Sequence, residues 1–232
     1  GSSLLHVGVG RRNAQNVGSG SGASLIRALN PAAWYRYGIG ITTATGVSVW
    51  VDQSGNGHDL VQATGSAQPA LQGDKSILFD GSSSVMQSLY TLNQPVTYYL
   101  LLKQITWTSN ARIFDGGTAL TILTQFGVSP AILINFGSAV GSDANLFLDS
   151  YGVVTVIGNG AASFLGVNNN AGAVLNAGAN NPGGFTLGAS RALNAAFANI
   201  QVKEVIAFPA AHDATTRRSV INYLGQVGNI SV

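Results

Sequence analysis

Carboxyl groups are the first candidates for chemistry in this sequence, because glycoside hydrolysis and general acid–base catalysis depend on them. The chain has 9 Asp and Glu residues, and Glu204 is its one glutamate. Two aspartate pairs are close in sequence, Asp52 with Asp59 and Asp143 with Asp149, but nothing beside them marks either pair as catalytic. Glu204 follows an alternating strand pattern that points it inward, where a carboxyl group needs a partner. We expect a structural glutamate bonded to an arginine or to backbone, with a general acid of raised pKa as the alternative.

Nucleophilic and metal chemistry find little support in the remaining residues. The histidines His6, His58 and His212 are widely spaced, and the sequence has no Cys, no His-Glu-x-x-His and no Gly-x-Ser-x-Gly motif. We therefore predict that the chain is not an enzyme and carries no cofactor other than a calcium ion. Calcium binds carboxylate, amide and loop carbonyl oxygens. The ligands predicted for it are Asp52, Asn56 and Asp80.

Aromatic side chains beside predicted loops are candidates for sugar binding, since a ring with polar neighbours can stack on a sugar. Buried packing is the alternative for most of them. The glycan-binding candidates are Trp34, Tyr35, Tyr37, Trp107 and Tyr151.

The chain of 232 residues is poor in charge, since 9% of its residues are charged against about 25% in typical domains. The net charge is +2, and no Lys or Arg lies between Arg112 and Arg191. We therefore expect no nucleic-acid partner. No apolar run approaches the ~20 residues that span a bilayer, so we expect no membrane insertion. Residues 116–190 contain only two charges, Asp143 and Asp149, which suits subunit packing or contact with a neutral glycan.

Short β-branched and aromatic runs, separated by Gly, Asn, Asp and Pro, predict an all-β sandwich of two antiparallel sheets. A short C-terminal helix is predicted from Ala214 to Leu224, with Asp213 as its N-cap, Val220 and Ile221 on its apolar face, and Gly225 as its stop. The predicted strands are Val47–Val51, Ile77–Phe79, Val96–Leu102, Arg112–Phe114, Leu120–Thr124, Ala131–Phe136, Leu146–Leu148, Val153–Ile157, Phe185–Leu187 and Ile200–Phe208.

The first 30 residues differ in composition from the rest, which suggests a flexible or anchoring arm at 1–30 followed by a sandwich domain at 31–232. Val17–Gly22 is a Gly/Ser tract of the kind found in linkers. If the arm docks on a partner, Arg11 and Arg12 are its charged contacts.

Three segments carry a resemblance to a known fold family: Trp50–Asp59, Gln68–Leu71 and Ile77–Gly81. Asn30–Tyr35 and Val202–Phe208 support it, as does a central strand at 96–102. Over about residues 30–225 the chain resembles the laminin G-like, concanavalin A-like lectin/glucanase domains, especially those of bacteriophage virion proteins. The resemblance implies a jelly-roll sandwich that binds glycans or proteins and sometimes calcium. Glucanases of this fold carry Glu-x-Asp-x-Glu on one strand, a pattern that a chain with one glutamate cannot contain.

These observations together predict a non-enzymatic phage virion surface protein, either a fibre or a head-decoration module. It would bind host surface glycans or neighbouring virion proteins, and it would form a homo-oligomer, with a trimer as the first expectation. The expected location is the virion surface, with a secreted or cell-surface location as the alternative. Two other functions stay open: a carbohydrate-binding module of a secreted bacterial protein and a divergent glycan hydrolase.

Overall fold

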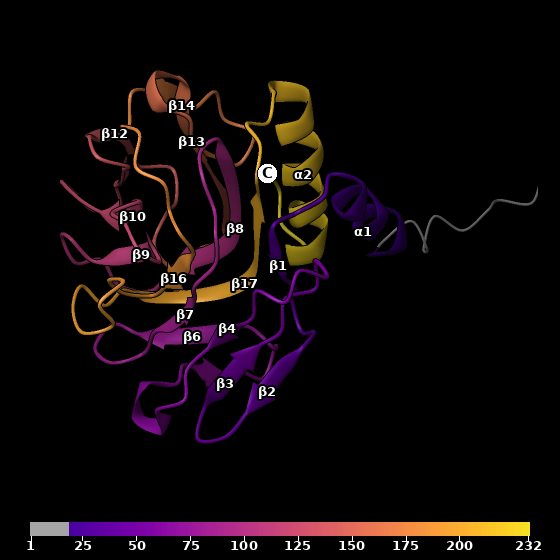
Figure 1. The fold of residues 1–232 in the computed structure, drawn as a ribbon, viewed down its shortest axis with the longest axis vertical. Helices are drawn as coiled ribbons and strands as arrows, with labels where there is room; N and C mark the ends of the chain where they lie inside the picture. The colour runs from indigo at the N-terminus through magenta and orange to yellow at the C-terminus, as the bar shows by residue number, and fades with distance from the viewer. Residues whose placement is uncertain (1–18) are drawn as a thin grey trace, which may run out of the picture.

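The computed structural model describes residues 19–232, and the predicted partner-anchoring residues Arg11 and Arg12 lie outside this range. Two antiparallel β-sheets stack face to face, one helix covers the outer face of one of them, and a second helix lies against the first (Figure 1). This is the predicted jelly-roll sandwich with one C-terminal helix, and one further helix precedes the first strand.

Sheet A contains the central strand of the fold and has the order β15-β14-β13-β8-β17-β6-β5, with β1 also paired to β17. Its strands are β1 (Ala33–Tyr35), β5 (Ala70–Leu71), β6 (Ile77–Asp80), β8 (Val96–Gln104), β13 (Gly152–Gly158), β14 (Ser163–Val167), β15 (Ala173–Leu175) and β17 (Asn199–Phe208).

Sheet B lies opposite, with the order β12-β11-β10-β9-β16-β7-β4-β3-β2. Its strands are β2 (Ile41–Thr43), β3 (Val47–Trp50), β4 (Leu60–Val61), β7 (Met86–Ser88), β9 (Arg112–Gly116), β10 (Ile122–Gln125), β11 (Ile132–Asn135), β12 (Ala139–Asp143) and β16 (Phe185–Leu187). Two short 3₁₀ turns, η1 (Gly65–Ala67) and η2 (Gly160–Ala162), complete the connections.

The main core fills the space between the sheets with large aromatic side chains, among them Trp50, Phe79, Tyr98 and Phe185. Strand β8 is buried on both faces, because sheet B covers one face and a helix covers the other. This double burial explains why Val96–Leu102 reads as an unbroken apolar run rather than an alternating one.

Helix α2 (Ala214–Gly228) packs on the outer face of sheet A and forms a second core there with residues such as Trp34, Tyr99 and Phe208. The Asp213 side chain accepts a hydrogen bond from Thr216 N–H at 2.8 Å, which confirms the predicted N-cap. The helix continues past Gly225, contrary to the prediction, because Asn229 takes the left-handed conformation that ends a helix, with φ of 51°.

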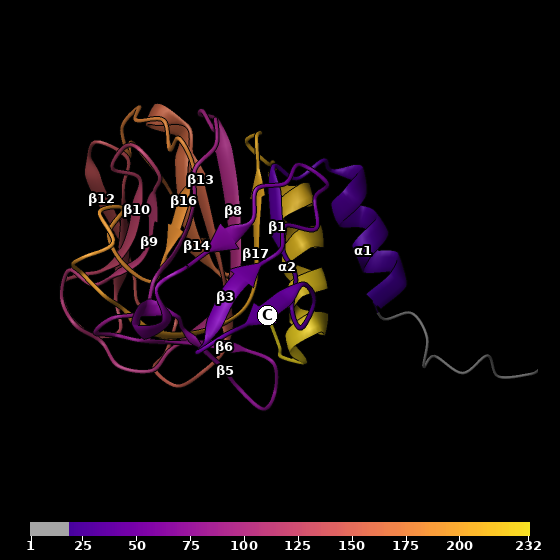
Figure 2. The ribbon, with the colours of Figure 1, turned by 60° about the horizontal axis from the view of Figure 1, so that its bottom comes forward.

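Helix α1 (Ser19–Ala28) packs against α2 on the side away from sheet A (Figure 2). The sequence predicts a flexible Gly/Ser tract at Val17–Gly22, yet from Ser19 onward the structure is helical. Ala23 and Ile26 are buried in the second core, and this burial offsets the poor helix propensity of the tract. Gly22 allows the close approach, since a Cβ there would lie 2.4 Å from Tyr223 Cδ2.

Most of the predicted strands are present with small shifts at their ends. Leu146–Leu148 is wrong as a strand, because this segment lies in the loop between β12 and β13. The shortest strands, such as β4 and β5, were not predicted, because 2 residues each are too few to show an alternating apolar pattern. In residues 19–232 neither helix has the length and hydropathy that a bilayer crossing requires.

Candidate functional site

A β-bulge decides where Glu204 points. Ile200 and Val202 face the main core between the sheets, and continued alternation predicts the same side for Glu204. The register between β17 and β8 shifts between Val202 and Glu204, so that Glu204 turns to the outer face of sheet A under the helices. The predicted inward orientation is therefore wrong, since an extra residue in one strand reverses every side chain beyond it.

Glu204 is nonetheless buried, with 1% of its surface exposed, and three donors hold its carboxylate. The indole Nε1–H of Trp34 donates to Oε2 at 3.1 Å, and the hydroxyl of Tyr223 donates to the same oxygen at 2.8 Å. The backbone N–H of Tyr37 donates to Oε1 at 3.0 Å. Strands β1 and β17 and helix α2 thus meet at a single carboxylate.

Burial raises the pKa of Glu204 above its usual range, against the opposing effects of these hydrogen bonds and of the nearby Arg36 charge. Burial likewise raises the pKa of the Tyr223 hydroxyl, and the adjacent Glu204 charge raises it further. A carboxyl group with a raised pKa in a concave site is a candidate for acid–base chemistry.

A pocket of about 360 Å³ opens over this carboxylate. We call it the Glu204 pocket. Its walls come from the segment after β1, from strand β17 and from the C-terminal half of α2. The lining residues are Arg36, Tyr37, Ile39, Glu204, Tyr223, Gln226 and Val227.

Arg36 supplies the positive charge of the pocket. Its guanidinium lies 5.0 Å from the centre of the Trp34 ring, while Arg27 lies 5.4 Å from the same ring. Among the described residues Arg36 makes no salt bridge, but its side chain is hydrogen-bonded to Tyr223 and its charge acts on Glu204. The pocket therefore combines a charged donor, two tyrosines and a buried acceptor, which are groups suited to sugar hydroxyls.

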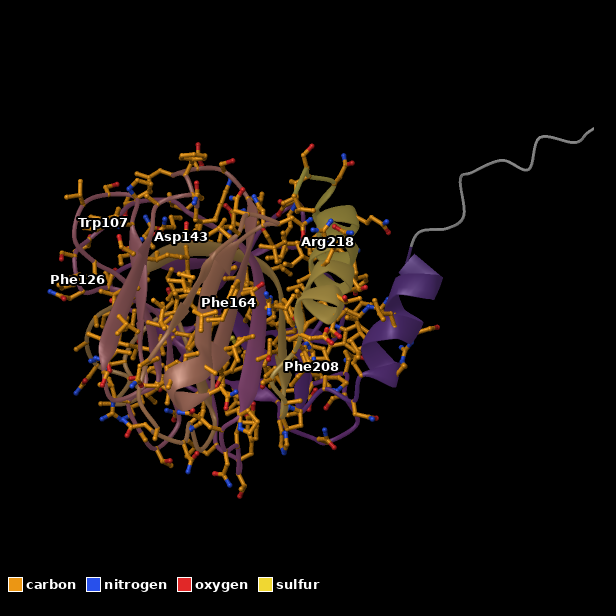
Figure 3. All side chains as sticks on the ribbon, turned by 90° about the horizontal axis from the view of Figure 1, so that it is seen from above. Trp107, Phe126, Asp143, Phe164, Phe208 and Arg218 are labelled. Carbon is orange, nitrogen blue, oxygen red and sulfur yellow. The ribbon has the colours of Figure 1, made fainter. Side chains whose placement is uncertain are left out.

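The predicted glycan-binding aromatics do not form one surface. Trp34 and Tyr35 are buried, with 0% and 1% exposed, so the expectation of accessible rings is corrected for both. Tyr37 and Tyr151 are half-buried on the α2 side of sheet A. Trp107 lies at the opposite end of the molecule near Phe126, far from Phe208 and Arg218 beside the helices (Figure 3).

The predicted calcium ligands belong to two separate turns. The Asp52 carboxylate organises the turn after β3, where Oδ1 accepts from the N–H groups of Trp34 and Ser54, each at 2.8 Å. Its Oδ2 accepts from the Ser54 hydroxyl at 2.7 Å and from His58 N–H at 3.0 Å. The Asn56 side chain donates within the same region, to the carbonyl of Pro31 at 3.0 Å. These groups serve the turn itself.

Asp80 ends strand β6, and its Oδ1 accepts from the N–H groups of Ser82, Ser83 and Ser84 at 2.8–3.0 Å. These hydrogen bonds hold the pKa of Asp80 well below its usual range despite partial burial. Residues 19–232 contain no group of three or more His, Cys, Asp or Glu side chains arranged to hold a metal ion. The structure therefore does not bring Asp52, Asn56 and Asp80 together.

The other acidic and histidine candidates also have local partners. Asp52 N–H donates to Asp59 at 2.9 Å, and Asp143 accepts from the backbone and side chain of Asn145. Asp149 pairs with Lys103 at 3.5 Å.

The two histidines within the described residues lie in separate places. His58 stacks on Tyr90 with ring centres 3.8 Å apart, whereas His212 shares a 2.8 Å hydrogen bond with the Tyr99 hydroxyl under α2. Neither histidine lines the Glu204 pocket.

The sequence reasoning named only Tyr37 and Glu204 among the residues of the pocket, and the most consequential of those it missed are Arg36 and Tyr223. Tyr223 lies between the apolar positions Val220 and Leu224 of the predicted helix, so its burial could have been foreseen. A buried hydroxyl needs a hydrogen-bond partner, and the one buried glutamate, Glu204, was the obvious acceptor. No comparable signal marked Arg36.

The sequence matches no protein-family model and no curated protein. Solved structures do share the fold. A Trypanosoma rangeli sialidase in complex with 2,3-difluorosialic acid is 15% identical with a TM-score of 0.59, covering 85% of this chain and 33% of the sialidase. A second structure of Trypanosoma rangeli sialidase has 12% identity, a TM-score of 0.61 and coverages of 88% and 34%. An arabinofuranosidase bound to arabinofuranosyl-α-1,2-xylobiose has 17% identity, a TM-score of 0.55 and coverages of 77% and 50%.

The similarity at these identities establishes the sandwich fold, and the chain spans a third to a half of the proteins it resembles. It also corrects the functional prediction. A non-enzymatic virion surface protein is contradicted, because the structures named above are sialidases and an arabinofuranosidase. The open alternatives, a carbohydrate-binding module and a glycan hydrolase, agree better with this finding.

Proposed function

We propose that this chain is a glycan-binding sandwich domain, of the concanavalin A-like type, in a protein that acts on glycans. The observation that carries the proposal is the Glu204 pocket. Its volume of about 360 Å³ is in the range of small-ligand sites. Arg36 offers donors, the hydroxyl oxygens of Tyr37 and Tyr223 offer acceptors because their own protons are donated to Asp74 and Glu204, and Gln226 offers both a donor and an acceptor.

The structural neighbours support the proposal in kind, because their printed titles name sugar ligands and sugar-cleaving enzymes. Partial coverage of those chains fits a domain that works beside another unit. The homo-oligomer, with a trimer first, and the secreted or cell-surface location remain predictions, and light scattering on the purified chain measures the oligomeric state.

A glycan array followed by titration calorimetry tests the binding proposal. We expect at least one glycan class to bind, and we expect Arg36→Ala and Tyr37→Ala to weaken that binding at least tenfold. Arg27→Ala is the matched control, since Arg27 contacts the same Trp34 ring but lies outside the pocket. If no glycan binds, or if Arg27→Ala weakens binding as much as Arg36→Ala, the proposal fails.

Hydrolysis in the same pocket is a second candidate, favoured by the 2.8 Å hydrogen bond between Tyr223 and Glu204. Most glycosidases use two carboxyl groups, but among the residues that line this pocket Glu204 is the only one. The nucleophile would then be Tyr223, as sialidases use a tyrosine. Its oxygen would attack the anomeric carbon while its proton passes to Glu204, and the departing glycosidic oxygen would take a proton from water. The hydroxide so formed would then attack the anomeric carbon of the glycosyl–tyrosine intermediate, and the released Tyr223 oxygen would take its proton back from Glu204.

Release of 4-methylumbelliferone from its N-acetylneuraminic acid and arabinofuranose glycosides tests the second candidate. We expect Tyr223→Phe and Glu204→Gln to abolish release, with Arg27→Gln as the control. Because Glu204 acts as the base, activity should rise as the pH passes upward through its raised pKa. Absence of release from the unmodified protein removes this candidate and leaves the binding proposal standing.

A further inference from the structure

The lysines of this charge-poor chain gather on one surface. The sequence has three lysines, Lys75, Lys103 and Lys203, far apart along the chain. Lys103 lies near the end of β8 and Lys203 on β17, which pair directly in sheet A. Lys75 lies beside the segment after β1, where a Cβ added at Gly38 would be 3.2 Å from its Cδ. The fold therefore brings three lysines that are far apart in the sequence onto one surface of the protein.

Two of these lysines share one aromatic ring. The Nζ of Lys203 lies 4.1 Å from the centre of the Tyr151 ring, and the Nζ of Lys103 lies 5.0 Å from it. Lys203 is also 5.4 Å from the ring of Tyr37. We call Tyr37, Lys203, Tyr151 and Lys103 the lysine–tyrosine row. The two rings hold the ammonium groups close together, although like charges repel one another.

The nearby carboxylates offset part of the positive charge of the row, because the charges of both Lys203 and Lys103 act on the Asp74 carboxylate. Lys103 pairs with Asp149 at 3.5 Å, but that carboxylate is 77% exposed, and such pairs contribute little. The Asp74 carboxylate accepts a hydrogen bond from Ser76 N–H at 3.0 Å. Among the described residues Lys203 makes no salt bridge. Lys203 thus has only a longer-range attraction to Asp74, and Lys103 has in addition one exposed salt bridge.

The row continues directly into the Glu204 pocket, because Tyr37 belongs to both. A chain of sugars that places one unit in the pocket would carry its next units over Lys203 and Tyr151. Two ammonium groups beside one ring suit an anionic substituent on such a unit. A nucleic-acid strand fits less well, since its regular phosphates need a longer positive stripe, and Asp74 and Asp149 flank this row.

We propose that the lysine–tyrosine row binds the carboxylate or sulfate group of an acidic glycan whose neighbouring sugar lies in the Glu204 pocket. The proposal rests on the function proposed above and adds the substrate class. The carboxylate of a uronic acid and a sulfate ester present the same charge to the two ammonium groups, so the experiment includes both.

Titration calorimetry on the full chain tests the inference with paired compounds. One pair is tetragalacturonate and its carboxyl-reduced, neutral counterpart; the other is a chondroitin 6-sulfate tetrasaccharide and its desulfated form. We expect at least one acidic member to bind about tenfold more tightly than its partner, with an advantage that shrinks as salt rises. Lys203→Gln and Lys103→Gln should each remove most of that advantage. Arg218→Gln, which removes an exposed charge from α2 outside the row, should not.

Equal binding of the acidic and neutral members, or equal loss in Arg218→Gln, overturns the inference while glycan binding stands. Binding of a thymidine octanucleotide as tight as that of the acidic glycans overturns it in favour of a general anion site. If none of the four tetrasaccharides binds and the array is also negative, the proposed function fails first.

Discussion

The Tyr223 hydroxyl donates to Glu204 Oε2 at 2.8 Å and thereby joins the C-terminal helix to strand β17 of sheet A. The indole of Trp34 donates to the same oxygen, so one carboxylate connects β1, near the start of the fold, with the consecutive elements β17 and α2 at its end. The hydrogen bond serves the fold and also forms the floor of the pocket. Its loss should therefore be measurable in stability as well as in binding.

Removing the Tyr223 hydroxyl should destabilise the protein. Tyr223→Phe leaves the Glu204 carboxylate with two donors instead of three, and a hydrogen bond to a charged group contributes about 1.5 to 3 kcal/mol. We expect the free energy of unfolding, measured by urea denaturation, to fall by that amount. An unchanged denaturation midpoint would show that the hydrogen bond contributes nothing.

Tyr98 provides the matched control for this change. It is also buried, but among the described residues its hydroxyl has no hydrogen-bond partner. Tyr98→Phe removes an unsatisfied polar group from the core, so the free energy of unfolding should stay the same or rise by about 1 kcal/mol. The contrast between the two variants separates the hydrogen bond from the general effect of losing an oxygen.

The Arg36 side chain should matter to ligand binding more than to folding. Arg36→Gln removes the charge of the Glu204 pocket but keeps a polar side chain, whereas Arg27→Gln removes a similar charge from outside it. We expect glycan affinity to drop several-fold in Arg36→Gln only, with melting temperatures of the two variants within a few degrees of each other. Loss of binding in both variants would show that binding depends on the contacts of the two arginines with the Trp34 ring and not on the charge of the pocket.

Asp52 should be a structural residue that works without a metal ion. Asp52→Asn keeps one acceptor oxygen and places an amide NH₂ group against backbone donors, so we expect a loss of about 2 to 4 kcal/mol. Added calcium chloride or EDTA should leave the melting temperature of the unmodified protein unchanged. A rise in the melting temperature on addition of calcium would contradict this expectation and support the predicted calcium site.

Asp149→Asn is the control for that experiment. Asp149 is 77% exposed and makes one salt bridge at 3.5 Å, so its replacement should change the free energy of unfolding by less than about 0.5 kcal/mol.

His212 should make stability depend on pH near neutrality. Burial lowers its pKa from 6.5, with a smaller opposite effect of Asp213 and a further lowering by Arg217. The unfolded chain therefore binds the proton more readily than the folded chain. The contribution of neutral His212 to the free energy of unfolding is complete above pH 6.5. It is lost as the pH falls toward the lowered pKa of His212 in the folded state.

Thermal melts between pH 5 and 8 measure this contribution. The melting temperature of the unmodified protein should fall more steeply below pH 6.5 than that of His212→Gln, which cannot titrate. Parallel curves for the two proteins would assign the pH dependence to other groups.

The sequence alone determined the fold class, because its signals are local. Alternating and continuous apolar runs indicate strands whatever their partners. The N-cap of α2 is equally local, because Asp213 accepts its hydrogen bond from Thr216, within the same four residues. The glutamate count also excluded a catalytic Glu-x-Asp-x-Glu strand. It did not exclude a fold shared with glycan-cleaving enzymes, and the functional prediction went wrong at that step.

Only the tertiary structure decided the site. The bulge that turns Glu204 outward arises from pairing between β17 and β8, and strand pairing is a non-local property that the periodicity of one strand does not contain. The meeting of Lys103, Lys203 and Tyr151 likewise needs three strands in register. Residues that are unremarkable in sequence become a pocket and a charged row because hydrogen bonding between strands brings them together.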